Sequence, residues 1–550
     1  MSKALSAAGA VSYFKDEYEH ARGSYYTEEG KTVGRWSGEL AEHFGLSGAV
    51  NRADFEQLCE GQDPRTSEQL VRHVKKHERT NQHGEEIETG GHRAGCDITF
   101  SAPKSVSLAA LVGGDDRIRE AHGEAVTAAL REVEKHAQAR LGGNAKAETT
   151  GKLLFASFDH DAARPDKKDG YAAPDLHTHN FAFNLTQPAA GKIKPVQPVE
   201  LYRSQKFGTA IYRAALAERL QKLGYEIEVD KRTGAPEIKG ISREYIEAAS
   251  PRQRDIKETA EALKTNSTRG AATRNRRTKT YNRDEMKARH QELDRQHGGQ
   301  ARGVVGEARE QAQAMSALLW DERTSRAKAQ ESVTFAIEKG SEREAVNDMR
   351  GLMTDALRRN LGRTTFEAVA AEMQTRQERG QLVGVVLDDD AKQRMTTEKT
   401  LRRESENIER MRAGQGTQQP IAERVSATVT TSQGVTLSES QRAAVEQIVT
   451  SRDQITGLQG KAGTGKTTTL AAVREAGERA GYDVQGFAPM TRAAQLLADS
   501  GMPTRTLQKF VRQKDDPEAA PRLLVLDESS LASTKQVNEF LSRVRPDDRV

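Results

Sequence analysis

The sequence predicts three successive regions of different fold class. Residues 1–300 contain strand-like and helix-like segments, turn clusters and all thirteen histidines, which is typical of an α+β domain. Residues 301–435 are highly charged, with apolar residues that recur three and four positions apart, which predicts a helical accessory segment. Residues 436–550 repeat a short apolar strand, a turn and a helix, which predicts βαβ units around a parallel sheet.

The composition limits the class of protein. The net charge of +4, from 84 basic and 80 acidic residues, is too small to indicate nucleic-acid binding by itself. No apolar run approaches the ~18–20 residues that span a bilayer, and charged residues follow Phe14 at once, so we expect a cytoplasmic protein. With only two cysteines, Cys59 and Cys96, a disulfide framework and a cysteine-based zinc site are excluded.

Three histidines of the first region form a candidate metal site. His177 and His179 lie in a strand-like run, Asp175–Phe183, where residues i and i+2 point to the same face. Another strand-like run, 152–158, ends just before His160, and antiparallel pairing across the intervening loop would bring His160 beside the pair. Three imidazoles suit a divalent metal with positions left open for a substrate oxygen. Surface histidines on a strand are the alternative.

Tyrosines are concentrated at the start of the chain. Four of the eleven lie within the first 26 residues: Tyr13, Tyr18, Tyr25 and Tyr26. A tyrosine hydroxyl can act as a nucleophile and form a covalent intermediate. Aromatic packing of an N-terminal helix is the alternative that the spacing alone favours.

Four blocks of residues in the first region carry a family resemblance. They are His160 with His177-Thr178-His179; Gly95-Cys96-Asp97-Ile98-Thr99-Phe100-Ser101-Ala102-Pro103-Lys104-Ser105-Val106-Ser107; Ser12-Tyr13-Phe14 with Ser24-Tyr25-Tyr26; and Trp36-Ser37-Gly38 with Phe44-Gly45-Leu46-Ser47-Gly48. From about residue 5 to 300 the chain resembles the relaxase domain of MobF-type conjugative relaxases, the TrwC/TraI kind. The resemblance implies a relaxase domain with an antiparallel sheet and a three-histidine metal site of the HUH type.

The same resemblance implies a metal-dependent DNA transesterase that acts on plasmid DNA during conjugation. A tyrosine attacks one strand at the origin of transfer and leaves a 5′-phosphotyrosine and a free 3′-OH. Tyr13 is the implied first nucleophile, and Tyr25 or Tyr26 serves a second transfer, with Tyr18 as a further candidate. The family usually has a tyrosine pair where this chain has Tyr13-Phe14. Retained bond energy in the phosphotyrosine lets the strand rejoin without ATP.

The implied metal centre holds Mg²⁺ or Mn²⁺ on His160, His177 and His179. The cation would polarise the phosphate oxygens and offset the charge that develops during attack. Asp97 matches the family aspartate beside this centre. It either orients a ligand histidine or takes the tyrosine proton, and the sequence leaves both roles open.

A basic run near the end of the first region is a candidate DNA contact. No acidic residue occurs from Thr265 to Arg283, a stretch that includes Arg274, Arg276, Arg277 and Lys279. Such a run can follow phosphates, although a solvated loop or helix face is an equal alternative. The expected partners are single-stranded DNA at an origin of transfer and other relaxosome and transfer-apparatus proteins.

The third region contains a phosphate-binding loop. Residues 460–467 fit the pattern G-x-x-x-x-G-K-[ST], with Gly460, Gly463, Gly465, Lys466 and Thr467 as candidate nucleotide ligands. The loop follows a strand-like run, 454–459, and opens an expected helix, 468–480. Backbone N–H groups would surround the phosphates, Lys466 would reach the outer ones, and Thr467 would hold Mg²⁺.

Sixty residues further on, four apolar residues, 523–526, precede Asp527 and Glu528. A buried strand that ends there places one carboxylate near the magnesium ion and lets the other position a water. With Gln441, an implied adenine contact, these motifs resemble a RecD-like superfamily 1 helicase over about 115 residues. A relaxase followed by such a helicase is the domain order of the MobF family. We expect ATP with Mg²⁺ at this site.

The sequence around Arg549 looks like the start of a further strand, so we expect the chain to stop within a RecA-like domain and this motor to be inactive. The leading interpretation is therefore a conjugative relaxase fused to the start of an ATP-dependent DNA helicase. The alternatives are a rolling-circle replication initiator of the HUH type and a DNA-binding regulator without strong catalysis.

Overall fold

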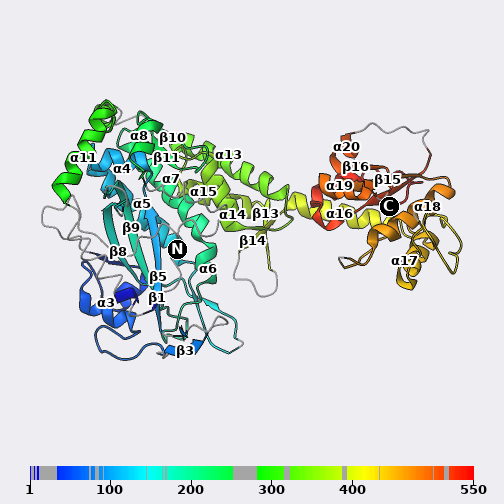
Figure 1. Ribbon diagram of the computed structural model, residues 1–550, viewed down its shortest axis with the longest axis horizontal. Coiled ribbons are helices and arrows are strands. Elements are labelled where there is room, and N and C mark those ends of the chain that lie inside the picture. The colour runs from blue at the N-terminus through cyan, green and yellow to red at the C-terminus, as the bar shows by residue number, and fades with distance from the viewer. Residues whose placement is uncertain are drawn as a thin grey trace. The chain divides into compact units, whose positions relative to one another are not determined.

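The computed structural model describes residues 1, 5–6, 9–11, 34–72, 76–80, 86–90, 92–143, 145–163, 165–166, 170–251, 282–314, 322–386, 393–432, 434–461, 463–499, 501–512 and 520–550 (Figure 1). The chain divides into two compact units. The first comprises Met1–Phe335 and Met353–Glu372, and the second comprises Ala336–Leu352 and Met373–Val550.

The first unit is built on a five-stranded antiparallel sheet in the order β1-β5-β9-β8-β2. Its strands are β1 (Leu5–Ser6), β2 (Arg35–Ser37), β5 (Arg93–Ser101), β8 (Phe155–Ala162) and β9 (Pro174–Phe183). The predicted antiparallel pairing of the two histidine-bearing segments is confirmed. The first of these strands begins three residues later than predicted and continues through His160.

Short hairpins and helices complete the first unit. The hairpins are β3 (Lys76–Thr80) with β4 (Glu86–Gly90), β6 (Gln138–Ala139) with β7 (Glu148–Thr149), and β10 (Ile227–Val229) with β11 (Pro236–Ile238). The helices are α2 (Glu39–His43), α3 (Arg52–Cys59), α4 (Lys104–Leu111), α5 (Arg117–Glu134), α6 (Val199–Arg203), α7 (Gln205–Lys222), α8 (Arg243–Ala248), α11 (Arg283–Gln296) and α12 (Gln300–Ala314). Asn51 and Asn282 cap α3 and α11 by accepting backbone N–H groups of the first turn.

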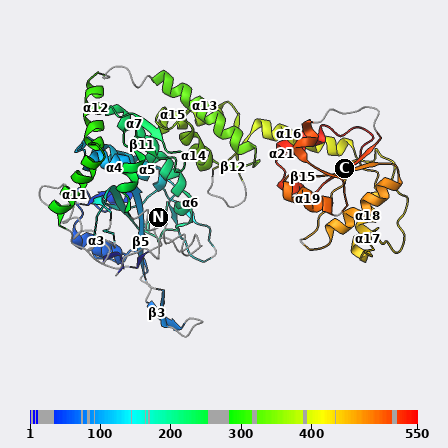
Figure 2. The same ribbon diagram turned by 45° about the horizontal axis from the view of Figure 1, so that its top comes forward.

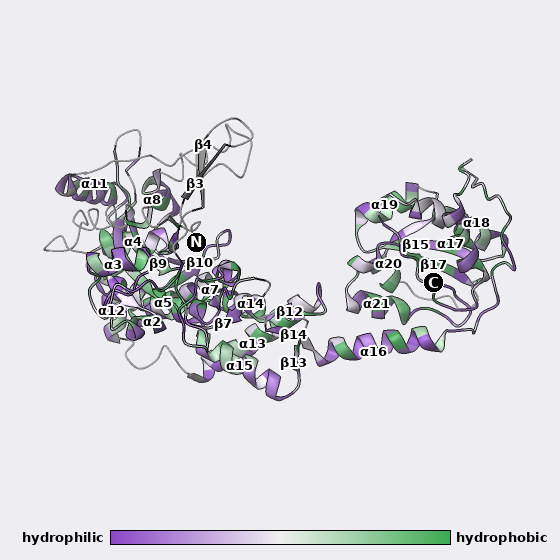
Figure 3. Cartoon of the chain, turned by 90° about the horizontal axis from the view of Figure 1, so that it is seen from below, coloured by the Kyte–Doolittle hydropathy of each residue, from purple (hydrophilic) through white to green (hydrophobic). Residues whose placement is uncertain are grey.

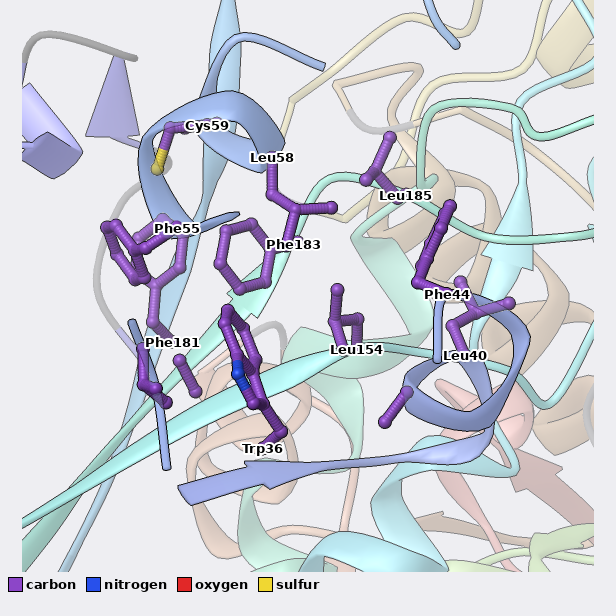
Figure 4. Close-up of a cluster of buried hydrophobic side chains, with 14 of the residues drawn as sticks. Trp36, Leu40, Phe44, Phe55, Leu58, Cys59, Leu154, Phe181, Phe183 and Leu185 are labelled. Atoms are coloured by element: carbon purple, nitrogen blue, oxygen red, sulfur yellow. The ribbon is translucent and has the colours of Figure 1, made fainter. Parts of the chain in front are cut away.

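The two faces of the sheet are covered differently. One face packs an aromatic cluster in which Phe181 and Phe183 of β9 meet Trp36 and Phe55 (Figure 4). Phe158 of β8 belongs to the same cluster. Helices α4, α5 and α7 cover the other face (Figures 1 and 2). Because side chains alternate along a strand, β8 and β9 contribute to both layers, and polar residues near their ends can be aimed separately at each face.

Gly95 shows how closely the central strands approach. A Cβ atom at this position would lie 2.1 Å from the carbonyl oxygen of Ala182 on the neighbouring strand, so only glycine fits. The two cysteines are buried and unbridged. Burial raises the pKa of the Cys96 thiol to about 11, so it stays protonated at neutral pH.

A buried carboxylate joins distant parts of the first unit. Glu134, the last residue of α5, accepts hydrogen bonds from the backbone N–H groups of Glu39 (2.9 Å) and Leu153 (2.6 Å). Burial raises the pKa of Glu134 to about 7, although both hydrogen bonds favour the ionised form. Since the pKa is higher in the folded chain than in the unfolded chain, this group's stabilisation is complete below pH 4.5 and is lost as the pH rises through about 7.

We therefore expect Glu134→Gln to raise the melting temperature at pH 8 relative to the wild type, and to do so much less at pH 5. A shift from 4.5 to about 7 corresponds to an effect on the order of 3 kcal/mol. Glutamine keeps an oxygen that accepts both N–H groups. Thermal unfolding at the two pH values measures the effect, with Glu120→Gln on the exposed side of the same helix as the control. An equal change at both pH values would show that Glu134 does not titrate in this range.

Three helices contribute residues to both units: α13 (Glu322–Ser341), α14 (Met349–Arg359) and α15 (Phe366–Glu378). The region predicted as purely helical also contains a three-stranded antiparallel sheet, β12 (Asn347–Asp348), β14 (Arg394–Thr397) and β13 (Leu382–Val385). This sheet was not predicted, because its strands have two to four residues, too few for an alternating pattern to show against charged surroundings. Helix α16 (Glu398–Ala413) follows, and Figure 3 shows hydrophilic and hydrophobic residues interspersed along it.

The rest of the second unit surrounds a parallel sheet in the order β16-β15-β17. The elements are α17 (Glu439–Thr450), α18 (Lys466–Arg479), β15 (Asp483–Ala488), α19 (Thr491–Asp499), β16 (Thr504–Thr506), α20 (Leu507–Arg512), β17 (Arg522–Leu526), a 3₁₀ turn (Ser529–Leu531) and α21 (Thr534–Leu541). Arg549 forms an isolated parallel bridge with Leu523 of β17.

The strand predicted over 454–459 is not formed as a regular strand. Only Gln454 and Thr456 make backbone hydrogen bonds with Val550, at 2.8 Å each. Gly457 lies directly after Thr456 and interrupts the strand pattern, since glycine disfavours a regular strand. Among the described residues, no helix combines the length and the apolar character that crossing a bilayer requires.

Candidate active site

The three candidate histidines come together on one face of the central sheet. His160 of β8 lies directly opposite His177 of β9, and His179 lies two residues further along the same strand. The ring centroid of His160 is 5.2 Å from the ring centroids of His177 and His179, which are themselves 5.1 Å apart. This is the face that carries the aromatic cluster, so the three imidazoles lie at the edge of an apolar layer.

The Nδ1 atoms of two of these rings are held by oxygen atoms. Nδ1 of His179 is 2.8 Å from Oδ2 of Asp97, which also accepts a hydrogen bond from the Thr99 hydroxyl at 2.8 Å. Nδ1 of His177 is 2.8 Å from the carbonyl oxygen of Asp175. When Nδ1 carries the proton, Nε2 is the lone-pair nitrogen, which is the form that a metal ligand needs. Burial lowers the pKa of His177, which favours its neutral form.

The donor set fits a divalent cation in its chemistry. Three imidazoles, two of them oriented by oxygen acceptors, are the kind of ligands that zinc, iron, nickel and related ions accept. Within the described ranges, no group of three His, Cys, Asp or Glu residues is arranged to hold a metal ion. The rings of His160 and His177 are stacked, and the ring of His179 meets both at its edge. Binding of an ion would require the ring nitrogens to turn toward a common point.

The block from Ser101 to Ser107 anchors the strand that carries His177. Lys104 donates to the carbonyl oxygen of Pro174 (2.5 Å), and the Ser107 hydroxyl accepts the backbone N–H of Leu176 (3.1 Å). These contacts hold the residues immediately before His177 against the start of α4. In the sequence this block is only a family marker, whereas in the fold it also fixes the position of β9.

Several predicted site residues lie outside the described residues. These are the four tyrosines, Tyr13, Tyr18, Tyr25 and Tyr26, and the basic residues Arg274, Arg276, Arg277 and Lys279. Their predicted roles as nucleophiles and DNA contacts remain predictions.

The phosphate-binding loop closes on its own lysine. Gly463 (φ 79°) and Gly465 (φ 78°) have left-handed backbone conformations that glycine adopts without strain. The Lys466 ammonium donates to the carbonyl oxygen of Gly460 at 2.9 Å, and Thr467 is exposed in the first turn of α18. The loop therefore presents the N-terminus of a helix, a lysine and a hydroxyl at one place, which is the arrangement that binds nucleotide phosphates.

The other predicted nucleotide ligands lie at the ends of neighbouring elements. Gln441 forms a capping box with Ser438 at the start of α17, and its Nε2 atom donates to the carbonyl oxygen of Thr464 in the loop at 3.3 Å. Asp527 follows β17, and its carboxylate accepts the backbone N–H of Glu528. Glu528 has a φ of 49°, a strained conformation for a residue with a side chain, and such strain is concentrated at functional sites.

Comparison with known proteins assigns the family. The TrwC relaxase family matches residues 7–304, more than half of the chain, and an AAA domain matches residues 436–550. The chain belongs to the TrwC relaxase family. The resemblance recognised from sequence motifs is thereby confirmed, and nothing in the matches favours a rolling-circle initiator or a regulator without catalysis.

Individual relatives agree with this assignment. The chain is 36% identical to the multifunctional conjugation protein TraI of Escherichia coli (strain K12) over 252 residues, which cover 43% of this chain and 13% of TraI. It is 36% identical to the probable conjugal transfer protein TraA of Sinorhizobium fredii over 113 residues, 19% of this chain and 10% of TraA. The chain thus spans at most 13% of the length of these curated relatives.

Solved structures of a relaxase also match. A metal-bound structure of the conjugative relaxase TrwC in complex with oriT DNA is 31% identical to this chain, covering 54% of it and 97% of the TrwC chain, with a TM-score of 0.45. A metal-free TrwC complex with oriT DNA is 29% identical over the same shares, with a TM-score of 0.44.

Proposed function

We propose that this protein is a conjugative relaxase that nicks one strand of plasmid DNA at an origin of transfer through a covalent 5′-phosphotyrosine. Membership of the TrwC relaxase family is the observation that carries the proposal, and the three clustered histidines with Asp97 support it. Single-stranded origin DNA is the proposed substrate, other relaxosome and transfer-apparatus proteins are the proposed partners, and the proposed location is the cytoplasm.

In the proposed mechanism His160, His177 and His179 would hold a divalent cation. The family resemblance implies Mg²⁺ or Mn²⁺, whereas the imidazole donors by themselves suit zinc, iron or nickel. When bound, this cation supplies positive charge to the scissile phosphate. Asp97 orients His179 through its contact with Nδ1, so of the two roles that the sequence left open the geometry favours this one. Tyr13 would form a bond from its hydroxyl oxygen to phosphorus while the bond from phosphorus to the 3′ oxygen breaks. The phenol proton passes to solvent, and the 3′ oxygen takes up a proton from solvent and leaves as the 3′-OH.

A cleavage assay tests this function. Incubation of the full chain with a labelled origin-of-transfer oligonucleotide, with Mg²⁺ or Mn²⁺ and with EDTA, should yield a covalent protein–DNA adduct only when metal is present. A scrambled oligonucleotide is the control for site specificity. Binding of the origin without any adduct, under all metal conditions, would instead indicate a DNA-binding regulator.

We further propose that residues 436–550 are the first part of a RecA-like helicase motor that binds ATP with Mg²⁺. Gly460, Gly463, Gly465, Lys466 and Thr467 would bind the phosphates and the ion, Gln441 the adenine, and Asp527 and Glu528 the ion and a water. Hydrolysis in such motors also draws on an arginine from a second lobe, worth about 10³–10⁵ in rate. These residues by themselves should therefore bind ATP and turn it over slowly.

Lys466→Ala should weaken ATP binding by roughly 10–100-fold, because one charge-assisted contact to the outer phosphates is lost. Equilibrium titration with a fluorescent ATP analogue and Mg²⁺ measures the change. Arg479→Ala, at the exposed far end of the same helix, is the matched control and should bind like the wild type. Equal affinities of the two variants would exclude Lys466 from the nucleotide site.

A further inference from the structure

The face of the sheet opposite the histidines carries a buried chain of hydrogen bonds that no part of the proposed mechanism uses. Asp159 and Thr178 lie directly opposite each other on β8 and β9. In the sequence Asp159 immediately precedes His160, and Thr178 lies between His177 and His179. Because side chains alternate along a strand, both point away from the three imidazoles. Helices α5 and α7 cover this face and supply His122 and Tyr212.

The contacts form one continuous chain. The Thr178 hydroxyl donates to Oδ1 of Asp159 (2.6 Å), and Nε2 of His122 lies 2.9 Å from the same hydroxyl oxygen. Nδ1 of His122 lies 2.8 Å from the hydroxyl oxygen of Tyr212. At the other end, Arg35 of β2 donates to Oδ2 of Asp159 (2.6 Å). The chain therefore connects two helices with three strands of the sheet.

The direction of every proton in the chain follows from its ends. An ionised carboxylate only accepts, so the single proton of the Thr178 hydroxyl points to Asp159. Nε2 of His122 must then donate to Thr178, and the neutral ring accepts at Nδ1 from the Tyr212 hydroxyl. Thr178 is completely buried and His122 is 1% exposed. Removal of one member would leave buried polar atoms without partners, so the members hold one another in place.

We propose that the hydrogen-bond chain, which runs from Tyr212 through His122, Thr178 and Asp159 to Arg35, positions the metal-binding histidines. The inference rests on the metal site proposed above. Thr178 lies between His177 and His179, and Asp159 immediately precedes His160, so the Thr178–Asp159 hydrogen bond joins the two strands at the level of the three rings. A shift of either strand would move His160 relative to His177. Their side chains lie on the face of the sheet opposite the imidazoles, so in this proposal they act on the ligands through the strands.

The Arg35–Asp159 contact at the outer end of the hydrogen-bond chain is the less informative place for a substitution. Arg35 and Asp159 line a cleft of about 650 Å³, and the Arg35 side chain is 53% exposed, so water can replace this contact. The buried part is therefore the place for substitutions. Thr178→Val keeps the shape of the side chain and removes its hydroxyl, whereas Thr178→Ser keeps the hydroxyl.

The test is calorimetric titration of Mn²⁺ alone into the EDTA-treated 550-residue protein. Thr178→Val should lower the Mn²⁺ affinity by about 10–100-fold, the range typical of residues that orient metal ligands, and Thr178→Ser should restore it. Tyr212→Phe, at the far end of the chain, should cost about 2–10-fold, the value of one neutral hydrogen bond. Binding of the origin oligonucleotide in EDTA should stay at the wild-type value in all three variants.

Ser157→Ala is the matched control, because Ser157 lies on the same buried face of β8 and donates to Oδ1 of Asn180 at 2.7 Å without joining the chain. It should lower the melting temperature and leave the Mn²⁺ affinity unchanged. Wild-type Mn²⁺ affinity in Thr178→Val, or an equal loss in Ser157→Ala, would overturn the positioning role. If Thr178→Val does not fold, Tyr212→Phe decides in the same way. Should the wild type bind Mn²⁺ no better than His177→Ala, the proposed metal site itself is wrong and this inference falls with it.

Discussion

Tyr13→Phe should abolish the covalent adduct between this protein and an origin-of-transfer oligonucleotide while leaving DNA binding near the wild-type level. Phenylalanine keeps the aromatic ring for any packing or stacking contact and removes only the hydroxyl that attacks phosphorus. Denaturing gel electrophoresis of a 3′-labelled oligonucleotide, of which the 3′ fragment stays attached to the tyrosine, measures the adduct. A gel-shift assay of the same oligonucleotide measures binding.

Tyr25→Phe and Tyr26→Phe are the matched variants for this experiment, because both replace a tyrosine of the same N-terminal segment. They should retain the first adduct, since their implied role belongs to a second transfer. If the adduct persists in Tyr13→Phe and disappears only in Tyr25→Phe or Tyr26→Phe, the first nucleophile has been assigned to the wrong tyrosine.

His177→Ala should reduce strand cleavage by about a hundredfold to several thousandfold, because the loss of one ligand removes several kcal/mol of charge stabilisation at the scissile phosphate. His177 is the central member of the site: it lies opposite His160 on the neighbouring strand and two residues from His179. Calorimetric titration of Mn²⁺ should show a parallel loss of affinity. Single-turnover cleavage at saturating oligonucleotide measures the rate without a contribution from DNA binding.

His43→Ala, on an exposed position of α2 away from the three clustered rings, is the control for this experiment and should cleave like the wild type. Cleavage by His177→Ala at the wild-type rate, with unchanged dependence on Mn²⁺, would mean that the cation acts elsewhere.

The histidine site could be predicted from sequence because its signal is local. An H-x-H pattern on one strand aims two rings at one face whatever surrounds the strand, and the block from Gly95 to Ser107 identified the family. The nucleotide loop was equally visible, since its glycines and lysine are needed within eight consecutive residues. The regular strand predicted before that loop does not form. Its residues Gln454 and Thr456 pair instead with Val550, almost a hundred residues away, and the local sequence cannot show such a contact.

The contacts that orient the site had no such signal. Asp97 was found only through its place in the family block, and its contact with His179 depends on the register between β5 and β9. His122 and Tyr212 lie on helices 56 and 34 residues from Thr178 in the sequence, and each looks there like an ordinary residue of an amphipathic helix. Nothing local distinguishes them from surface or core residues.

The sequence by itself thus determined the family, the order of the regions, the nucleotide loop and the candidate metal ligands, because each of these is written in a few neighbouring residues with a fixed spacing. Only the tertiary structure decided that His160 lies opposite His177 and that Asp97 contacts Nδ1 of His179. It also decided that a buried hydrogen-bond chain joins β8 and β9 on the opposite face of the sheet. The physical reason is that such contacts are made across strands and between layers, where the register of a sheet and the packing of helices on it set which side chains meet.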